Sequence, residues 1–409
     1  MVLLVCWQYF SKISFSCFGN WISSLSISVN LPYNNYMAII FGFKTEIKAN
    51  NVQRTAFLKH AGTARHAYNW GLGLTKQILD HNKANPEDKI KFPSSIDLHK
   101  WLVALVKSEN AWYYEVSKCP PQYALKALRE AWDRCFKKTS GVPKFKKKGR
   151  HDSFTLDGSI KLESKRIKVP VIGWLKTYEI LPTGYTLKSV TISRTADRWF
   201  ISFSLEVEPQ ITPKTVDVVG VDLGVKSLAT LSTGQVFEGT KSYKQYEAKL
   251  QGLQWLNRHK IIGSANWKKA QIKIARLHQK IANIRKDTLH KLTTYLAKNH
   301  SEIVIEDLNV SGMMANHKLA KAIQDMGFYE FRRQLEYKCK IYGSTLTVVS
   351  RWLPSSKTCS SCGQVKESLS LSERIFSCEC GLVLDRDYNA SLNLKKMAVS
   401  HTVSACGLV

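Results

Sequence analysis

The chain has 409 residues, of which 44% are hydrophobic, and it carries 60 Lys and Arg residues against 32 Asp and Glu residues. This length exceeds what one hydrophobic core usually spans, so it predicts two or more domains. A formal net charge of +28 would make the chain repel itself without a polyanionic partner, and it therefore indicates nucleic acid. A membrane surface is the other polyanion, but the sequence offers no basic amphipathic anchor or lipidation motif for it.

The first 36 residues differ in composition from the rest. They contain no Asp, Glu or Arg and a single lysine, Lys12. They lack the basic start and the unbroken apolar run of a signal peptide or a spanning helix. Met37 then begins a segment that looks like an ordinary start. We interpret residues 1–36 as an N-terminal extension from an upstream start codon, disordered or not translated, with a genuine tail of low order as the alternative.

Alternating and helical patterns organise the first half of the chain. Residues 38–47 alternate like a strand, and an apolar face predicts a helix over 52–81. Further helices are predicted over 97–107 and 121–136. Alternation returns over 153–208 and predicts strands, which with the first strand would form a small β-barrel interrupted by the helices.

A strongly basic segment follows the last of these helices. It runs from residue 137 to 150 without an acidic residue, and Gly141 and Pro143 keep it out of a helix. A solvated loop is the simpler interpretation, but the aromatic ring inside a basic chain favours a loop that grips phosphates and stacks on a base. The candidate nucleic-acid contacts are Lys144, Phe145, Lys146, Lys147, Lys148 and Arg150.

From residue 216 onward the pattern is that of an α/β domain. Asp222 follows the apolar run 218–221, and Glu306 follows the apolar run 303–305, so both are expected at strand ends. Asp387 lies at the start of a helix predicted over 388–396. A buried unpaired carboxylate is costly, so three of them brought together by a sheet predict a site for divalent cations that hydrolyses phosphodiesters. Asp307 and Asp385 are neighbours that would assist the site or simply occupy turns.

Two closely spaced cysteine pairs lie between the second and third carboxylates. They are Cys359 and Cys362, then Cys378 and Cys380, with a glycine after each pair. This spacing is typical of a zinc ribbon, although the second pair has one intervening residue instead of two. Four thiolates leave no open position, so the zinc would be structural. The remaining cysteines are scattered, which suits a reducing cytoplasm and not a secreted disulfide scaffold.

Together these motifs resemble the TnpB (OrfB) proteins of bacterial insertion sequences. The resemblance extends from Met37 to about Lys396. It rests on these segments: Gly-Val-Asp-Leu-Gly-Val at 220–225, Ile-Glu-Asp-Leu-Asn-Val at 305–310, Ser-Lys-Thr-Cys-Ser-Ser-Cys-Gly at 356–363, Asp-Arg-Asp-Tyr-Asn-Ala-Ser at 385–391, Arg65 with Tyr68 and Asn69, and Gly141 with Pro143, Phe145 and Lys146.

The resemblance implies an α+β multidomain protein related to the type V CRISPR effectors. It implies an RNase H-like (RuvC-like) nuclease domain with an inserted zinc ribbon, preceded by a wedge β-barrel that carries a helical recognition insertion. The expected boundaries are an extension at 1–36, the wedge at 37–50 and 151–213, the helical domain at 51–150, the nuclease domain at 216–355 and 383–397, the ribbon at 356–382 and a tail at 398–409.

By the same resemblance the activity is RNA-guided cleavage of double-stranded DNA next to a short flanking motif, in a prokaryotic cytoplasm at the nucleoid. The partners would be a guide RNA from the end of the element and the target DNA, bound by one or two protomers. Asp222, Glu306 and Asp387 would hold Mg²⁺, and the four cysteines would hold Zn²⁺.

Two other functions stay open at this point. A nuclease-inactive regulator of transposition would be expected to lack a carboxylate, but all three are present. A transposase that joins strands itself usually needs a Tyr nucleophile with a His pair, and the sequence has no His-x-His, although such proteins are often labelled transposases.

Overall fold

The computed structural model describes residues 39–370 and 372–405, so the predicted extension at 1–36 lies outside the described residues. The strands are β1 (Ile39–Glu46), β2 (Ser153–Asp157), β3 (Lys161–Glu163), β4 (Arg166–Val169), β5 (Gly173–Lys176), β6 (Ser189–Thr195), β7 (Arg198–Val207), β8 (Val216–Asp222), β9 (Ala229–Leu231), β10 (Val236–Phe237), β11 (His300–Glu306), β12 (Thr345–Val349), β13 (Ile375–Ser377) and β14 (Val383–Asp385). The helices are α1 (Asn51–Ala84), α2 (Ser95–Trp101), the π-turn η1 (Leu102–Lys107), the 3₁₀ turn η2 (Ala111–Glu115), α3 (Cys119–Phe136), α4 (Ser242–Arg258), α5 (Ala265–Asn299), α6 (Val310–Ala315), α7 (Ala320–Met326), α8 (Phe328–Tyr342) and α9 (Arg386–Ala405).

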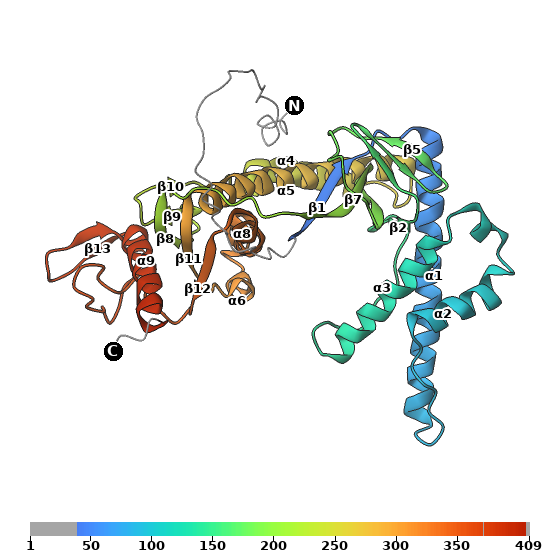
Figure 1. Cartoon of the computed structure of the whole chain (residues 1–409), viewed down its shortest axis with the longest axis horizontal. Helices are drawn as coiled ribbons and strands as arrows, with labels where there is room; N and C mark the ends of the chain where they lie inside the picture. The colour runs from blue at the N-terminus through green and yellow to red at the C-terminus, as the bar shows by residue number, and fades with distance from the viewer. Residues whose placement is uncertain (1–38, 371, 406–409) are drawn as a thin grey trace, which may run out of the picture. The chain divides into compact units, whose positions relative to one another are not determined.

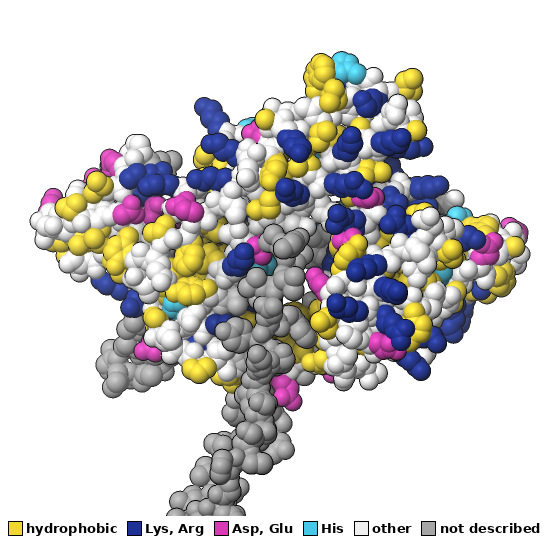
Figure 2. Space-filling view, turned by 90° about the horizontal axis from the view of Figure 1, so that it is seen from above, with side chains coloured by type: hydrophobic (Ala, Val, Ile, Leu, Met, Phe, Trp, Pro, Cys, Tyr) yellow, Lys and Arg dark blue, Asp and Glu magenta, His cyan; other side chains and the backbone are white. Residues whose placement is uncertain are grey.

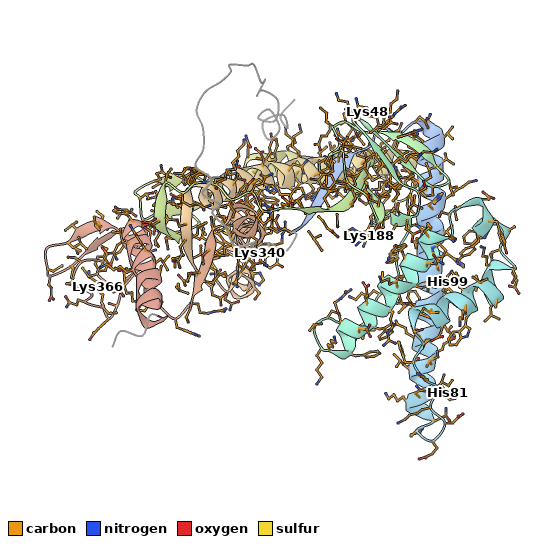
Figure 3. The ribbon with its side chains drawn as sticks, in the orientation of Figure 1. Lys48, His81, His99, Lys188, Lys340 and Lys366 are labelled. Carbon is orange, nitrogen blue, oxygen red and sulfur yellow. The ribbon has the colours of Figure 1, made fainter. Side chains whose placement is uncertain are left out.

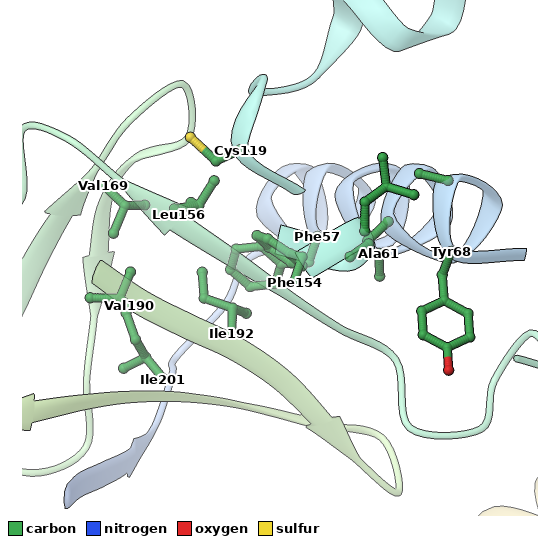
Figure 4. Close-up of a cluster of buried hydrophobic side chains, with 14 of the residues drawn as sticks. Phe57, Ala61, Tyr68, Cys119, Phe154, Leu156, Val169, Val190, Ile192 and Ile201 are labelled. Atoms are coloured by element: carbon green, nitrogen blue, oxygen red, sulfur yellow. The ribbon is translucent and has the colours of Figure 1, made fainter. Parts of the chain in front are cut away.

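A single apolar cluster joins the first helices to the first sheet. Figure 4 shows Phe57 of α1 beside Phe154 of β2, with Ile192 and Ile201 from β6 and β7 nearby. The side chains of Phe57, Ile192 and Ile201 are fully buried. Because these residues come from segments on both sides of the helical insertion, α1 is anchored to the sheet at one end.

Gly71 in the middle of α1 has a packing role. A Cβ atom at this position would lie 2.7 Å from Leu125 Cδ2 and 3.0 Å from Leu128 Cδ2, both on α3. Glycine lowers the helix propensity of this segment. In the folded chain the missing side chain lets α3 approach α1 closely, with Leu125 and Leu128 fully buried between them.

The predicted β-barrel is not what the described residues form. They contain a four-stranded sheet in the order β1-β7-β6-β2 and a separate three-stranded sheet in the order β3-β4-β5. The two sheets meet through one isolated bridge between Ile47 and Thr177, and no strand pairing among the described residues closes them into a barrel. Strands β3 to β5 have only three or four residues each, which is too short to carry a continuous ladder around a closed sheet.

The second half of the chain is an α/β layer structure around a five-stranded sheet, ordered β10-β9-β8-β11-β12 (Figure 1). Strands β8, β11 and β12 are parallel, and β9 and β10 run antiparallel at one edge. Ile303 and Ile305 of β11 pack into the cluster that contains residues of α5 and α8. Val304 faces the other way and packs with Leu394 and Ala398 of α9. The sheet is therefore covered on both faces, as its apolar strands predict.

One helical segment of this half is divided by a turn, and another helix is longer than predicted. The long helical segment 241–299 is split into α4 and α5 at a turn that contains Gly263, whose φ is +87°. Helix α9 continues through Ala405, although the sequence predicted a helix ending at 396 and a tail from 398. The apolar face of α9 includes Ala398, which is buried against the sheet and therefore supports the extra turns.

None of the helices in the described part of the chain is long and apolar enough to span a membrane.

Candidate functional site

Two of the predicted carboxylates lie at the same edge of the central sheet. Asp222 is the last residue of β8, and Glu306 is the last residue of β11. The two strands are parallel neighbours, with Val221 paired to Ile305. Because parallel strands end at a common edge, the register places Asp222 and Glu306 one step further at adjacent strand ends. Open α/β sheets bind ligands at this carboxyl edge.

The third carboxylate arrives on α9, and Gly220 permits its approach. Asp387 lies in the first turn of α9, which packs across β8. A Cβ atom at Gly220 would lie 2.0 Å from the carbonyl oxygen of Ser391 and 2.5 Å from the backbone nitrogen of Lys395. Any larger residue would therefore push the helix away from the strand. The glycine of the Gly-Val-Asp motif brings the helix start that carries Asp387 up to Asp222.

Asp222 shows that the three groups form one electrostatic unit. Burial in the sheet, followed by the negative charges of Asp387, Glu306 and Asp385, raises its pKa to about 7. The positive charge of Arg386 acts in the opposite direction. Near neutral pH the folded, metal-free chain therefore holds a proton on Asp222 for much of the time. A group of this kind is typical of a functional site.

Glu306 and Asp307 are adjacent in sequence but have different surroundings. Burial raises the pKa of Glu306, and the charge of Asp307 raises it further. Asp307 has a lowered pKa because it accepts hydrogen bonds from Arg351 and Arg332. The Arg332 Nη1 atom lies 2.6 Å from Asp307 Oδ1, and Arg351 donates to Oδ2. Both oxygens of Asp307 thus accept from guanidinium groups, whereas the carboxylate of Glu306 is partly buried.

Asp385 and Arg386 have roles that the sequence did not reveal. Asp385 Oδ1 accepts hydrogen bonds from the backbone nitrogens of Asp387, at 2.9 Å, and of Tyr388, at 3.2 Å, so it caps the start of α9. The Arg386 Nε atom lies 3.8 Å from Asp387 Oδ1, and its Nη1 atom donates to the carbonyl oxygen of Ser370. A cation is therefore built into the carboxylate cluster. The sequence could have indicated this role, because Arg386 lies between Asp385 and Asp387.

The four cysteines meet in space as their spacing predicts. Cys359 Sγ and Cys380 Sγ lie 3.6 Å apart, as do Cys362 Sγ and Cys378 Sγ, and all four sulfur atoms lie within 4.8 Å of one another. Among the described residues this is the one group of three or more His, Cys, Asp or Glu side chains that is gathered so tightly. The three carboxylates are therefore further apart than the thiols. The shorter second pair does not displace Cys380 from the set.

The glycine after each cysteine pair has a left-handed backbone that makes the turn possible. Gly363 has a φ of +81° and Gly381 a φ of +88°. Each backbone nitrogen donates to a cysteine carbonyl oxygen at 3.0 Å, that of Cys359 and that of Cys378. Both turns direct two sulfur atoms to one point, so the cluster could bind a tetrahedral zinc ion.

The basic segment 137–150 is an exposed loop that helix α1 holds in place. Asn69 Nδ2 donates to the carbonyl oxygen of Lys146 at 2.9 Å, and the backbone nitrogen of Lys146 donates back to Asn69 Oδ1 at 2.8 Å. The Lys146 ammonium group lies 4.1 Å from the ring centre of Tyr68. Arg65 pairs at 3.3 Å with Asp152, which also accepts from the nitrogen of Gly149. The Arg65, Tyr68 and Asn69 motif is therefore a clamp for the loop.

The predicted contact residues of this loop are exposed, but two of them also contact side chains of α1. Lys144, Lys147, Lys148 and Arg150 are exposed without a carboxylate partner among the described residues. Lys146 has a pKa lowered by desolvation, since it lies against Tyr68. The Phe145 ring is 52% exposed and has the Lys76 ammonium group 5.0 Å from its centre. The loop thus offers free cations around one exposed ring.

Positive charge is not confined to this loop. Figure 2 shows Lys and Arg side chains spread across one face, with fewer acidic side chains among them. In Figure 3 the labelled Lys48, Lys188, Lys340 and Lys366 lie on separate parts of the fold, from the turn after β1 to the cysteine-bearing segment. This distribution suits a polyanion with an extended contact surface.

Three family models match the chain. One named OrfB_IS605 and described as "Probable transposase" matches residues 202–317, and the TNB domain of Cas12f1-like proteins matches 328–394. A model described as a helix-turn-helix domain matches 37–84, although the described residues of this region form β1 and the single long helix α1.

Several named proteins are similar to this chain, two of them over most of their length. A protein of Streptomyces pristinaespiralis, named "Putative RNA-guided DNA endonuclease", is 41% identical over 376 residues, which cover 89% of this chain and 90% of that protein. InsQ of Escherichia coli K12 bears the same designation and is 36% identical over 386 residues, covering 89% and 93%. A TnpB-like protein of Acanthamoeba polyphaga mimivirus, L770, is 28% identical over 58% of this chain and 51% of its own.

Solved structures share the fold at low identity. The protein in a complex of Cas12f1 with its guide RNA and target DNA has a TM-score of 0.54 at 15% identity, covering 88% of this chain and 99% of that one. The mini-endonuclease Cas_phi3 has a TM-score of 0.50 at 10% identity, covering 89% and 93%. The two relatives above 30% identity, which match nearly the whole chain, show that the chain belongs to the TnpB family, the OrfB proteins of insertion sequences.

Proposed function

We propose that this protein is an RNA-guided DNA endonuclease of a transposable element, which cleaves double-stranded DNA beside a short flanking motif. The observation that carries the proposal is the electrostatic coupling of Asp222, Glu306 and Asp387 at one sheet edge. The two relatives above 35% identity that are named RNA-guided DNA endonucleases support it, because they match nearly the whole chain. A guide RNA would supply sequence specificity by base pairing, and the protein would grip backbones.

The donor chemistry of the carboxylate cluster fits a hard divalent cation. Asp222, Glu306 and Asp387 would hold Mg²⁺ through carboxylate oxygens, the ligands this ion prefers. Bound there, the metal would activate water and stabilise charge on the phosphate. Without a metal the chain holds Asp222 partly protonated near neutral pH, and this proton would have to leave before a cation binds. The positive charge of Arg386 offsets part of the repulsion among the carboxylates. The Asp385 cap fixes the first turn of α9 and so orients Asp387.

The thiol cluster has a structural role in this proposal. Cys359, Cys362, Cys378 and Cys380 would hold one Zn²⁺ with no open position for water. The loop of this ribbon contacts the carboxylate cluster, because Arg386 donates to Ser370 and its backbone nitrogen donates to Arg374. Zinc binding would therefore stabilise the position of Arg386 and Asp387.

The remaining segments are assigned to nucleic-acid contact. The helical segment 51–150 and the sheet segments 37–50 and 151–213 would bind the guide RNA and the target, with Lys144, Lys147, Lys148 and Arg150 on phosphates and Phe145 on a base. The clamp formed by Arg65, Tyr68 and Asn69 would hold that loop ready before nucleic acid arrives.

A plasmid cleavage experiment tests the function. The full chain is produced with RNA from the flanking end of its element. The purified complex is then mixed with magnesium and a plasmid library that carries a guide-matched target beside randomised bases. The proposal predicts breaks at the matched target, dependent on guide and on magnesium, and an enriched flanking motif.

Two variants on β8 test whether cleavage depends on Asp222 in particular. Asp222→Ala is expected to abolish cleavage but not binding of the target. Asp217→Ala is the matched control, because Asp217 lies on the same strand and is exposed. Guide-dependent binding with no cleavage by the unmodified protein would contradict the nuclease and favour a regulator of transposition.

A further inference from the structure

A cavity of about 570 Å³ opens beside the carboxylate edge and is not explained by metal binding. Its wall includes Glu306, so the cavity begins at the proposed reaction centre. Arg332 and Arg351 line it as well, together with apolar residues such as Leu308 and the exposed ring of Tyr329. Apolar surface with a few convergent polar groups is the usual lining of a small-molecule-sized site.

Asp307 holds the two arginines of this wall in fixed positions. It follows Glu306 directly, and each of its oxygens accepts from a different guanidinium group, Oδ1 from Arg332 and Oδ2 from Arg351. Arg332 comes from α8, and Arg351 follows β12, whose Val349 is paired with Glu306. The guanidinium groups of Arg332 and Arg351 are therefore held beside the sheet edge that carries Glu306. Because both side chains are already ordered, a ligand that binds them does not have to order them.

Of the three arginines that line the cavity, Arg351 has the most N–H groups free to bind a ligand. Arg332 also pairs with Glu336 at 3.1 Å, and Arg333 binds Glu330 through two hydrogen bonds. Within the described residues, the one hydrogen-bond partner of the Arg351 guanidinium is Asp307. A guanidinium group has five N–H donors in a fork that matches phosphate oxygens.

Two exposed aromatic rings border the same arginines. The side chain of Tyr329, which lines the cavity, is 71% exposed, and Trp352, which follows Arg351, is 87% exposed. Large aromatic rings usually bury most of their surface, so two that remain in solvent beside paired arginines indicate a ligand with a flat face and a negative group. A nucleotide has both features.

We propose that this cavity receives one unpaired nucleotide of the DNA strand being cut, with a backbone phosphate on Arg351 and Arg332 and the base against Tyr329 or Trp352. The inference rests on the proposed nuclease function and specifies how its substrate is held. Because the wall is shared with Glu306, the bound phosphate lies next to the one that is cut. A paired base would first have to be flipped out of its helix at the cost of its pairing and stacking, so the site favours a strand that is already unwound.

The test measures contact without cleavage. The full chain with its guide RNA, in buffer without added magnesium, is irradiated with single-stranded DNA that carries 4-thiothymidine, and the crosslinked peptides are mapped by mass spectrometry. Crosslinks are expected on Tyr329 or Trp352. Arg351→Gln is expected to lower their yield roughly tenfold, because the phosphate loses its charged fork.

Matched variants separate this site from general charge effects. Arg258→Gln removes one exposed cation at the end of α4, a helix that is not assigned to nucleic-acid contact, and the yield should stay unchanged. If Arg351→Gln fails to fold, Tyr329→Ala gives the answer, since an exposed ring can be removed without a cavity. Crosslinks mapped only to other segments, or an equal yield in Arg351→Gln and Arg258→Gln, would overturn the proposal.

A second experiment uses cleavage itself. Abasic sites are placed one at a time along the cut strand, so that the phosphates stay and single bases are lost. The single-turnover rate should fall at one or two positions beside the cut, and Tyr329→Ala with Trp352→Ala should remove that position dependence. A chain with no guide-dependent cleavage but with the expected crosslinks would refute the proposed function and leave the nucleotide site standing. Cleavage that is insensitive to every abasic position would refute the site alone.

Discussion

At the residue scale, the carboxylate cluster combines groups whose surroundings differ sharply. Asp222 is desolvated in the sheet and close to two other acids, and its pKa is raised to about 7. Asp307, one residue after Glu306, has a lowered pKa because two arginines bind it. Sequence alone treats all of these as acidic side chains near strand ends. Their neighbours separate a carboxylate suited to binding a cation from one that holds arginines in place.

The raised pKa of Asp222 predicts a stability that depends on pH in the metal-free protein. The folded state holds this proton more tightly than the unfolded state, so the stabilisation is complete below about pH 4 and is lost as pH rises through about 7. Asp222→Asn should abolish this contribution. At pH 8 without added magnesium it should raise the free energy of unfolding by on the order of 2–4 kcal/mol.

Denaturant unfolding at pH 5 and pH 8 checks this expectation. Asp217→Asn is the control on the same strand, where the side chain is exposed, and it should keep the pH dependence of the unmodified chain. Equal loss of stability between pH 5 and pH 8 in the Asp222 variant and the unmodified chain would show that another group titrates.

At the element scale, the site depends on how closely α9 crosses β8. Gly220 lies two residues before Asp222 and under the backbone of Ser391 and Lys395. Lys214 adds a second constraint before the start of β8, because its ammonium group donates to the carbonyl oxygens of Ala297 and Tyr342 at the ends of α5 and α8. The elements around the sheet are thus fixed by backbone contacts, and these are not visible as side-chain patterns.

Gly220→Ala is expected to separate α9 from the sheet. The new Cβ atom would lie 2.0 Å from a backbone oxygen, which cannot move without the helix. We expect a loss of roughly 3 kcal/mol or more in unfolding free energy and loss of cleavage, because Asp387 moves with α9. Gly252→Ala in α4 is the control, since nothing lies within 4 Å of its Cβ position. Thermal unfolding of both variants checks this, and equal melting temperatures would contradict the packing argument.

The cysteine ribbon should be coupled to the carboxylate cluster. Cys378→Ser is expected to reduce bound zinc, measured by elemental analysis, and to lower the cleavage rate at least about tenfold, because the ribbon loop contacts Arg386. Cys135→Ser is the matched control, as Cys135 lies on α3 outside the cluster. Full zinc content in the Cys378 variant would count against the metal site, and full activity without zinc would count against the coupling.

At the scale of the whole molecule, the excess of 28 positive charges determines how nucleic acid binds. Within the described residues, basic side chains occur on elements of both halves and have few acidic partners in the 137–150 loop (Figure 3). Affinity for nucleic acid should therefore fall steeply with salt, by an amount set by the number of phosphates contacted.

Replacing Lys144, Lys147 and Lys148 together by Gln should reduce the slope of log affinity against log salt by about 2–3. The matched control replaces Lys83, Lys89 and Lys91, which are equally exposed but lie beside Glu87 and Asp88 at the far end of α1. Fluorescence anisotropy with labelled DNA at several salt concentrations measures both. The same reduction of slope in both variants would show that the loop contributes only its general positive charge and makes no particular phosphate contacts.

The sequence by itself determined the local chemistry of this protein. Apolar runs before Asp222 and Glu306 identified strand ends, because an unpaired charge is costly inside a buried run. The cysteine spacing identified a four-thiol cluster, since short spacings direct sulfur atoms to one point by local turns. The limits of α3 were close to the predicted 121–136 for the same reason, because a helical pattern is a local signal.

Only the tertiary structure decided which residues meet across distance. No local pattern shows that Arg332 and Arg351 share the two oxygens of Asp307, or that Gly220 lies under α9. The predicted barrel failed on the same ground, because alternation predicts strands but not whether they pair into one closed sheet or into two. Contacts between segments far apart in the chain are set by packing of the whole domain, and they determine the pKa of Asp222 and the cavity beside Glu306.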